Sequence, residues 1–203
     1  MIKEILFGTT NEAKIKQVQG ALIPIGVQVM GVMDKASLPQ IIEDGKTAQE
    51  NAMKKAMIYA KAFNVIVLSM DNALYFDKLS DKEQPGLHVR RINSSNTRPS
   101  DEELLNYYSM LIRRFGDQTT GRWEFAICVA APDGRIKETT IISPRIFTSI
   151  PSQKVVSGYP LESIQVDPKT EKYISEMTQE EQDLFWQQTI GKPLQEFIKE
   201  IQF

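Results

Sequence analysis

The chain is poor in the residues that build disulfides, zinc sites and histidine-based catalysis. Its 203 residues include one cysteine, Cys128, and one histidine, His88. A single cysteine cannot form an internal disulfide, and one Cys with one His leaves almost no material for a zinc cluster or a Cys/His catalytic pair. Because Cys128 stands in the apolar run at residues 125–131, we expect it to be buried as a small hydrophobe.

The chain also lacks a strong net charge and long apolar segments. Its 24 Lys and Arg residues nearly balance 26 Asp and Glu, which gives no general electrostatic reason to bind a nucleic-acid backbone. A small anionic ligand held by a few local cations is compatible with that balance. No apolar run reaches the length of a membrane span, and residues 1–7 lack the apolar core of a signal peptide. We therefore expect a reduced, cytoplasmic setting, with no nucleic-acid or membrane partner.

What the chain does have is enough apolar material for one domain. With 41% hydrophobic residues in 203, residues 1–203 are most simply read as a single domain, with two lobes, that folds alone. The hydrophobic pattern of the first part alternates strands with helices, which indicates an α/β fold. It predicts strands at residues 4–9, 27–32 and 65–68, and helices at residues 12–22 and 48–63.

The second part of the chain combines a polar excursion, a hairpin and further helices. Residues 78–99 are polar and turn-rich, which is typical of a surface segment. Two apolar runs around a Pro-Asp-Gly turn predict a β-hairpin, so the sheet should be mixed. Two Ser/Thr-x-x-Glu capping boxes and one proline mark helix starts. The predicted starts are Ser100, Thr178 and Pro193, and the hairpin strands are at residues 123–131 and 136–142.

A polar motif follows the first strand directly. Thr9, Thr10, Asn11 and Lys14 place hydroxyls, backbone N–H groups and an ammonium where a strand gives way to a helix, which is one way to build a phosphate site. The alternative is a helix N-cap made by Thr10 or Asn11, with a solvated Lys14. Taken alone, the motif favours the N-cap, because it lacks the glycines of a P-loop or a dinucleotide fingerprint.

Three further charged residues are candidates for chemistry. Glu43 lies in an acidic loop and Lys55 in the helix after it, and their alternatives are a solvated carboxylate and an exposed helix lysine. Asp71 follows the apolar strand at residues 65–68, at the C-terminal end where open α/β sheets place ligands. An ionised carboxylate there needs a partner or a metal to offset desolvation, unless it caps a helix.

The order and spacing of these segments resemble the Ham1 or inosine triphosphate pyrophosphatase family. Residues 9–14 match its Thr/Ser-Gly-Asn-x-x-Lys motif, except that Thr10 replaces glycine. Residues 43–56 match Glu-Thr-Gly-x-Thr-x-x-Glu-Asn-Ala-x-x-Lys-Ala, which is a long and specific pattern. The family's Asp-Asp-Ser-Gly-Leu corresponds to residues 70–74, and its Pro-Gly-x-x-x-x-Arg to residues 85–91.

This resemblance implies both a fold and an activity. The fold is an elongated mixed β-sheet flanked by helices, with two lobes and a central cleft, in a protein that is commonly a homodimer. The activity is Mg²⁺-dependent hydrolysis of a non-standard nucleoside triphosphate to the monophosphate and pyrophosphate. Nothing in the sequence shows a dimer interface independently.

The resemblance also implies roles for the candidate residues. Glu43 and Asp71 would hold Mg²⁺, and Asp71 would also orient or deprotonate the attacking water. Lys14 and Lys55 would neutralise charge on the phosphate oxygens. The residues that would fix the position of the phosphate chain are Thr9, Thr10 and Asn11.

The chain departs from the family at the base-binding end. Tyr159 survives as a stacking platform, and Glu162 replaces the family's aspartate only if two residues are inserted. The family's lysine, histidine and arginine are replaced by Gln182, Gln187 and Gln188. Because a site built for one hydrogen-bond pattern leaves groups unpaired with another, we expect an altered base preference.

Met70 is a second departure, because the family has an aspartate at this position. Its loss removes one carboxylate from the neighbourhood of the expected metal. Together with the three glutamines, it keeps an alternative open: a nucleotide-binding or regulatory module of the same fold, in which catalysis is weakened or lost.

Overall fold

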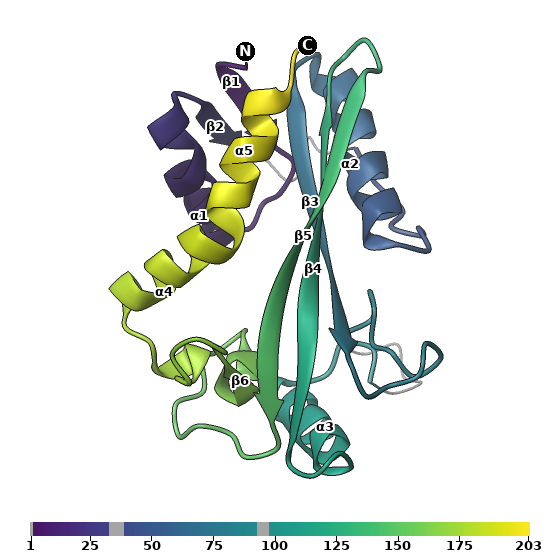
Figure 1. Ribbon diagram of the computed structural model, residues 1–203. Coiled ribbons are helices and arrows are strands. Elements are labelled where there is room, and N and C mark those ends of the chain that lie inside the picture. The colour runs from purple at the N-terminus through teal and green to yellow at the C-terminus, as the bar shows by residue number, and fades with distance from the viewer. Residues whose placement is uncertain (1, 33–38, 93–97) are drawn as a thin grey trace. The chain divides into compact units, whose positions relative to one another are not determined.

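A computed structural model describes residues 2–32, 39–92 and 98–203 of the chain. Six strands form one mixed sheet in the order β2-β1-β3-β4-β5-β6 (Figure 1). β1 pairs in parallel with β2 and β3, whereas β5 and β6 are antiparallel. The predicted α/β class with a mixed sheet is therefore confirmed. The strands are β1 (Glu4–Phe7), β2 (Gln28–Gly31), β3 (Val67–Phe76), β4 (Gln118–Ala130), β5 (Ile136–Thr148) and β6 (Gln165–Val166).

The helices flank this sheet, and two of them have the predicted limits. Apolar stripes and caps at residues 12–22 and 48–63 define α1 (Glu12–Leu22) and α2 (Ala48–Phe63). Within the described ranges, no helix is both long and apolar enough to cross a membrane. The other α-helices are α3 (Asp101–Arg113), α4 (Gln179–Trp186) and α5 (Lys192–Glu200). Shorter helical turns are η1 (Ile23–Ile25), η3 (Pro160–Ile164), η4 (Ile174–Glu176) and the π-helical turn η5 (Gln187–Gly191).

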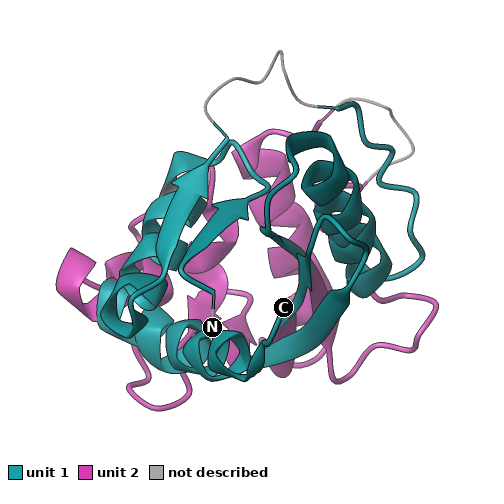
Figure 2. Cartoon of the chain, turned by 90° about the horizontal axis from the view of Figure 1, so that it is seen from above, with its two compact units in different colours: residues 1–72, 124–142, 183–203 teal, residues 73–123, 143–182 magenta. Residues whose placement is uncertain are grey.

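The chain divides into two compact units, which Figure 2 colours separately. β3, β4 and β5 each contribute residues to both units, as does α4. Unit 1 comprises residues 1–72, 124–142 and 183–203, and unit 2 comprises residues 73–123 and 143–182.

In unit 1, helices cover both faces of the strands. α1 and α5 lie on one side, and α2 lies on the other (Figure 1). Burial of aliphatic side chains between the strands and α1 and α5 is the main stabilising contribution on that side. This core includes Phe7, Val18, Leu22, Leu68, Leu194 and Ile198.

Cys128 is buried near the C-terminal end of β4, as the sequence predicts for its burial. Its side chain has no exposed surface, and burial raises the pKa of the thiol to about 12. The thiol is therefore protonated at neutral pH, and Cys128 acts as a small core residue.

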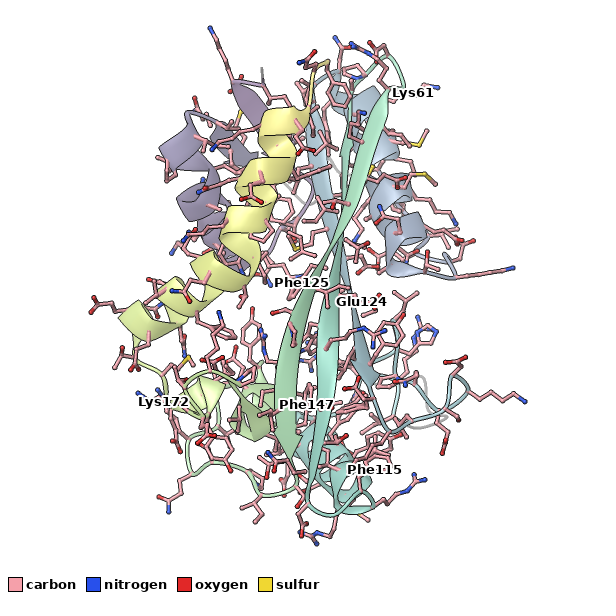
Figure 3. All side chains as sticks on the ribbon, in the orientation of Figure 1. Lys61, Phe115, Glu124, Phe125, Phe147 and Lys172 are labelled. Carbon is pink, nitrogen blue, oxygen red and sulfur yellow. The ribbon has the colours of Figure 1, made fainter. Side chains whose placement is uncertain are left out.

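Unit 2 has its own core, in which aliphatic side chains surround a group of aromatic rings. The rings of Phe76 and Phe147 pack edge to face with centroids 4.7 Å apart, and Tyr108 of α3 lies beside Phe76. Phe147 and Phe115 are labelled in Figure 3, where they come from β5 and from the segment after α3. α3 begins with the predicted capping box, in which Ser100 and Glu103 exchange hydrogen bonds.

β3 differs from its prediction. The strand does not end at residue 68 but continues to Phe76, so Asp71 lies inside it rather than at its C-terminal end. The prediction was wrong because it followed only the continuously apolar run, and the residues after Leu68 mix polar with apolar side chains. The register with β1 nevertheless ends at the pair Phe7 and Leu68. Asp71 therefore lies beyond the carboxyl end of β1, which is where ligands bind in open α/β sheets.

The hairpin is confirmed, with longer strands than predicted. β4 begins at Gln118 rather than Trp123, and β5 continues to Thr148 rather than Ile142. The turn between them needs a positive φ at Gly134, which is 91°. The additional strand residues are partly polar and alternate between buried and exposed positions, so a continuous apolar run does not reveal them.

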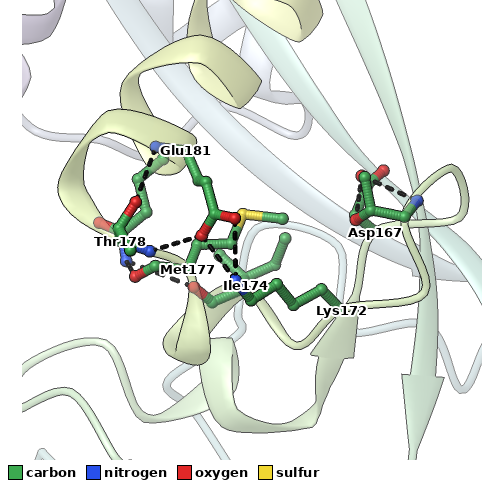
Figure 4. Close-up of polar contacts among 8 residues, drawn as sticks. Asp167, Lys172, Ile174, Met177, Thr178 and Glu181 are labelled. Atoms are coloured by element: carbon green, nitrogen blue, oxygen red, sulfur yellow. Dashed lines mark hydrogen bonds and ion pairs between the residues drawn. The ribbon is translucent and has the colours of Figure 1, made fainter.

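Pro193 lies in the first turn of α5, as predicted, but the chain is already helical before α5 begins. α4, the π-helical turn η5 and α5 form one continuous helix. Proline inside a helix cannot donate to the carbonyl four residues earlier and clashes with it. Here the widened π turn changes the register just before Pro193, and the N–H of Lys192 donates to the Gln187 carbonyl. The predicted capping box of Thr178 and Glu181 is confirmed (Figure 4).

Candidate active site

The motif after β1 forms a helix cap. The Asn11 Oδ1 accepts the N–H of Lys14 at 3.1 Å, and the Asn11 N–H donates to the Thr9 Oγ1 at 3.2 Å. The N-cap alternative is therefore correct for Asn11 and not for Thr10. This cap does not exclude a phosphate-binding role. Thr9 and Thr10 are half-buried just before α1, and backbone N–H groups at the start of a helix attract anions.

Gly8 allows this turn to pass close to α2. A Cβ on Gly8 would lie 2.8 Å from the Tyr59 ring, which is closer than real Cβ contacts. The Gly8 N–H donates to the Leu68 carbonyl of β3 at 2.9 Å. Glycine thus brings the end of β1, β3 and α2 together at one place in unit 1.

Glu43 and Lys55 form an ion pair next to this place. The Lys55 Nζ lies 2.6 Å from the Glu43 Oε1. The Lys55 side chain is 15% exposed, so the exposed-lysine alternative is wrong, whereas the Glu43 side chain is 51% exposed. The carboxylate thus has one neutralising partner and remains accessible to a ligand.

The loop that carries Glu43 is held by the first turn of α2. The Gly45 N–H donates to the Asn51 Oδ1 at 2.8 Å, and the Lys46 N–H donates to the Glu50 Oε2 at 2.7 Å. Thr47 is the N-cap and accepts the Glu50 N–H. We call these three contacts the loop clamp. Much of the long sequence motif therefore has a structural role, which is to present Glu43.

Gly45 cannot be enlarged without opening the loop clamp. A Cβ on Gly45 would lie 2.5 Å from the Asn51 Oδ1, and Asn51 is 4% exposed. Because a buried amide that loses its partner costs about 1–3 kcal/mol, we expect Gly45→Ala to lower the free energy of unfolding by that amount. Denaturant unfolding measures it.

The matched control for this prediction is Gly20→Ala. A Cβ on Gly20 finds its nearest neighbour at an ordinary 3.6 Å, and Gly20 lies in α1. Alanine there should leave stability unchanged or raise it by up to about 1 kcal/mol, because alanine is the better helix former. Equal unfolding midpoints for Gly45→Ala and the unchanged protein would contradict the role of the loop clamp.

Lys14 interacts electrostatically with the other three charged candidate residues. Burial, and then the positive charge of Lys55, hold the pKa of Lys14 below its ordinary value, while Asp71 and Glu43 oppose this shift. The charges of Lys55, Asp71 and Glu43 therefore all act on Lys14 within unit 1. The alternative of a solvated Lys14 is wrong, and the four residues predicted for the phosphates and the metal converge.

Asp71 faces this cluster from β3. Its Oδ1 accepts the N–H of Asn72 at 3.0 Å, and because it lies within a strand it does not cap a helix. Side chains alternate along a strand, so Met70 points to the opposite face, where it packs against the core between the strands and α1 and α5. The missing family carboxylate at Met70 therefore does not leave a gap on the face of Asp71.

Ser69 is a polar neighbour that sequence reasoning missed. It lies two residues before Asp71 on the same face of β3 and is fully buried. Within the described residues its hydroxyl has no hydrogen-bond partner. Unpaired buried hydroxyls are costly and are typical of sites that hold a ligand or an ion. The period-two spacing from Asp71 is the sequence signal that could have identified it.

The acidic groups suit a metal that shares its coordination with a substrate. No group of three or more His, Cys, Asp or Glu side chains able to hold a metal occurs in the described part of the chain. Glu43 and Asp71 offer two carboxylates. Mg²⁺ is usually bound by one or two carboxylates together with phosphate oxygens and water, so this donor set fits Mg²⁺ better than a metal that needs a complete protein cage.

The residues predicted to contact a base are distributed over both units. In unit 2, Tyr159 is 44% exposed just before η3. The Gln182 amide donates weakly to the carbonyls of Ile174 and Met177, at 3.3 and 3.5 Å. Burial raises the pKa of Glu162, and the charges of Arg145 and Lys154 oppose that shift. The base-contact roles of Tyr159 and Gln182 stay predictions.

The other two predicted base contacts lie in the π turn of unit 1. The Gln187 amide packs against Gly191, where a Cβ would lie 2.3 Å from the Gln187 Oε1, and near Gly20 of α1. Gln188 is exposed. Their roles also stay predictions, and the placement of Gln187 adds a packing role that the sequence did not indicate.

Comparison with known proteins identifies the family of this chain. Residues 5–188 match the model of the Ham1 family. A dITP/XTP pyrophosphatase of Exiguobacterium sp. is 29% identical over 181 residues, covering 88% of this chain and 87% of its own. The dITP/XTP pyrophosphatase of Bacillus subtilis is 26% identical over 186 residues, covering 90% of each chain.

Two solved structures show the same fold. The Ham1 protein of Staphylococcus aureus superposes with a TM-score of 0.74 at 22% identity, covering 97% of this chain and 98% of its own. A HAM1 protein from Coxiella burnetii gives a TM-score of 0.77 at 19% identity, covering 99% and 100%. At these identities the superpositions establish the fold, and activity has to be argued from the site.

Proposed function

This chain belongs to the Ham1 family, and from that premise we propose that it hydrolyses a nucleoside triphosphate to the nucleoside monophosphate and pyrophosphate. The observation that carries the proposal is the convergence of Lys14, Lys55, Glu43 and Asp71 on one place in unit 1. Two ammonium groups and two carboxylates at one place suit a polyphosphate that arrives with a divalent cation.

The phosphate end of the proposal follows from the charges. Lys14 and Lys55 neutralise the phosphate oxygens as charge shifts toward the leaving pyrophosphate. The burial of Lys14 strengthens its interaction with an anion, because a less polar surrounding screens the charges less. The Thr9 and Thr10 hydroxyls and the first turn of α1, capped by Asn11, orient the phosphate chain.

The hydrolytic step uses Asp71. The Asp71 carboxylate orients a water and accepts its proton as the water oxygen forms a bond to phosphorus. The phosphorus–oxygen bond that joins the monophosphate to pyrophosphate breaks, and pyrophosphate leaves with the bonding electron pair. Glu43 and Asp71 would hold Mg²⁺, which when bound would neutralise phosphate oxygens and lower the pKa of bound water.

The base end of the proposal is an altered preference. Tyr159 would stack on the base, and Gln182, Gln187 and Gln188 would offer amide groups where the family has charged or ionisable ones. Amides both donate and accept, so the preferred triphosphate need not be the one named for the relatives. A homodimer and the cytoplasmic setting belong to the same proposal.

Pyrophosphate release across a panel of triphosphates tests the activity. The panel contains standard, deaminated and modified nucleoside triphosphates with Mg²⁺, and both pyrophosphate and orthophosphate are measured. We expect at least one triphosphate to give monophosphate and pyrophosphate in equal amounts. Release of orthophosphate alone would show a different reaction. Tight nucleotide binding without turnover in Mg²⁺ or Mn²⁺ would favour the regulatory-module alternative.

A further inference from the structure

Gly158, the residue before Tyr159, has both of its backbone polar groups held by charged side chains. The Gly158 N–H donates to the Asp101 Oδ2 at 2.6 Å, and the Arg90 Nη2 donates to the Gly158 carbonyl at 2.7 Å. Arg90 and Asp101 also form an ion pair with each other, with the Arg90 Nη1 3.6 Å from the Asp101 Oδ1. All of these residues belong to unit 2. We call this set the Gly158 bracket.

The Gly158 bracket holds a segment that would otherwise have few constraints. Gly158 has a φ of 81°, a conformation that glycine adopts easily, and its side is open to solvent. Tyr159 follows it with an exposed ring, while its N–H donates to the Val156 carbonyl and its carbonyl accepts the N–H of Glu162. The backbone around Tyr159 is thus fixed on both sides although the ring is free to meet a ligand.

Hydrogen bonds in which one group is charged are stronger than those between neutral groups, and the backbone of Gly158 makes two of them. An exposed loop ordered before a ligand arrives does not lose that conformational freedom on binding. Stacking of a base on an aromatic ring is sequence-tolerant but depends on the presentation of the ring. A bracketed backbone next to an exposed tyrosine is therefore suited to stacking.

We propose that Arg90 and Asp101 are positioning residues that set Tyr159 for stacking on the base of the substrate, an inference that rests on the function proposed above. Loss of either one should weaken base binding without slowing the chemical step. The expected signature is a rise in KM with an unchanged kcat.

A purely structural role for Asp101 needs a separate control. Asp101 is the first residue of α3, where a negative charge also interacts favourably with the helix dipole. Glu102 is the second residue of the same turn, is exposed and shares that charge effect. Comparing Asp101→Ala with Glu102→Ala therefore separates the Gly158 bracket from the helix.

Steady-state kinetics on the preferred triphosphate test the proposal. We expect Arg90→Met and Asp101→Ala each to raise KM about tenfold with kcat within about twofold, and Arg90→Lys, which keeps one donor, to recover part of the loss. Glu102→Ala and Arg114→Met should leave KM unchanged, since Arg114 makes an exposed ion pair with Glu83 at 3.4 Å and lies over the Phe115 ring, away from Gly158 in the chain. An unchanged KM in both bracket variants, or a fall in kcat with KM constant, would overturn the proposal.

Two further measurements separate this inference from the proposed function. Inorganic tripolyphosphate has no base, so as an inhibitor it should bind the bracket variants and the unchanged protein equally. Amide hydrogen exchange at residues 157–159 should be faster in Asp101→Ala than in Glu102→Ala. If the unchanged protein shows no turnover, the proposed activity fails, but nucleotide Kd values still decide on the bracket: a tenfold weaker Kd supports it, and an equal Kd overturns it.

Discussion

Replacing Asp71 by Asn should lower kcat about a thousandfold while the protein keeps its fold. A carboxylate that takes a proton in the transition state contributes about 10²–10⁴-fold, and an amide cannot accept that proton. Asp71 also faces Lys14 beyond the carboxyl end of β1, where a metal-bound phosphate would meet it. Asparagine has the same shape and keeps an Oδ1 for the Asn72 N–H, so stability should change little.

Pyrophosphate release by purified Asp71→Asn, beside its unfolding midpoint, measures both effects. Asp44→Asn is the matched control, because Asp44 lies next to Glu43 but pairs with Lys54 at 2.5 Å on the exposed side of the loop. We expect that control to stay within about twofold of the unchanged protein, as exposed ion pairs contribute little. Equal rates for Asp71→Asn and the unchanged protein would show that Asp71 is not part of the chemistry.

Lys14→Met should reduce activity about a hundredfold and at the same time leave stability equal or higher. The activity falls because one of two cations on the phosphates is lost, and a well-placed charge of this kind contributes about 10²–10³-fold. The stability holds because burial and Lys55 both disfavour the charged form of Lys14, so its pKa is lowered. Methionine keeps the apolar stem and removes the buried charge.

The pH dependence of stability is an independent test of the stability change expected for Lys14→Met. The unfolded chain binds the Lys14 proton more strongly than the folded protein, since the folded pKa lies below the ordinary 10.5. The cost of the buried charge is therefore full below the lowered pKa and disappears as pH rises toward 10.5. The stability gained in Lys14→Met should be largest below that lowered pKa and shrink above it.

Denaturant unfolding at several pH values, with pyrophosphate release at one, measures both parts of this prediction. Lys54→Met is the control, because Lys54 is the neighbour of Lys55 in α2 but pairs with the exposed Asp44. A Lys14→Met protein that is less stable than the unchanged protein at neutral pH would show that Lys14 stabilises the empty site. In that case burial and Lys55 would not destabilise the charged form of Lys14.

The sequence predicted those elements whose signals are local. α1 and α2 have the expected limits because each combines an apolar stripe with a side-chain cap at Asn11 or Thr47. The end of β3 could not be predicted in this way, since it depends on pairing with strands distant in sequence. The continuous last helix depends on a π turn before Pro193, for which the sequence offers no pattern.

The same contrast applies to the site. Lys14, Glu43, Lys55 and Asp71 were named from motif spacing and family resemblance, but only the structure shows that the other three charges act on Lys14. Ser69 was missed because a serine inside an apolar run carries no signal until Asp71 is placed on the same face of β3. The sequence suggested that Met70 replaces a metal ligand. In the structure, the alternation of side chains along β3 points Met70 toward the core instead.

The loop clamp has a consequence for the order in which the site is assembled. Its hydrogen bonds join residues three to six positions apart, so closing them costs little chain entropy and requires only the first turn of α2. Asp71 instead depends on the pairing of β3 with β1, two segments about sixty residues apart. We therefore expect the Glu43 loop to form early and locally as the chain folds. Asp71 should reach the site later, because it is placed only once β3 has paired with β1.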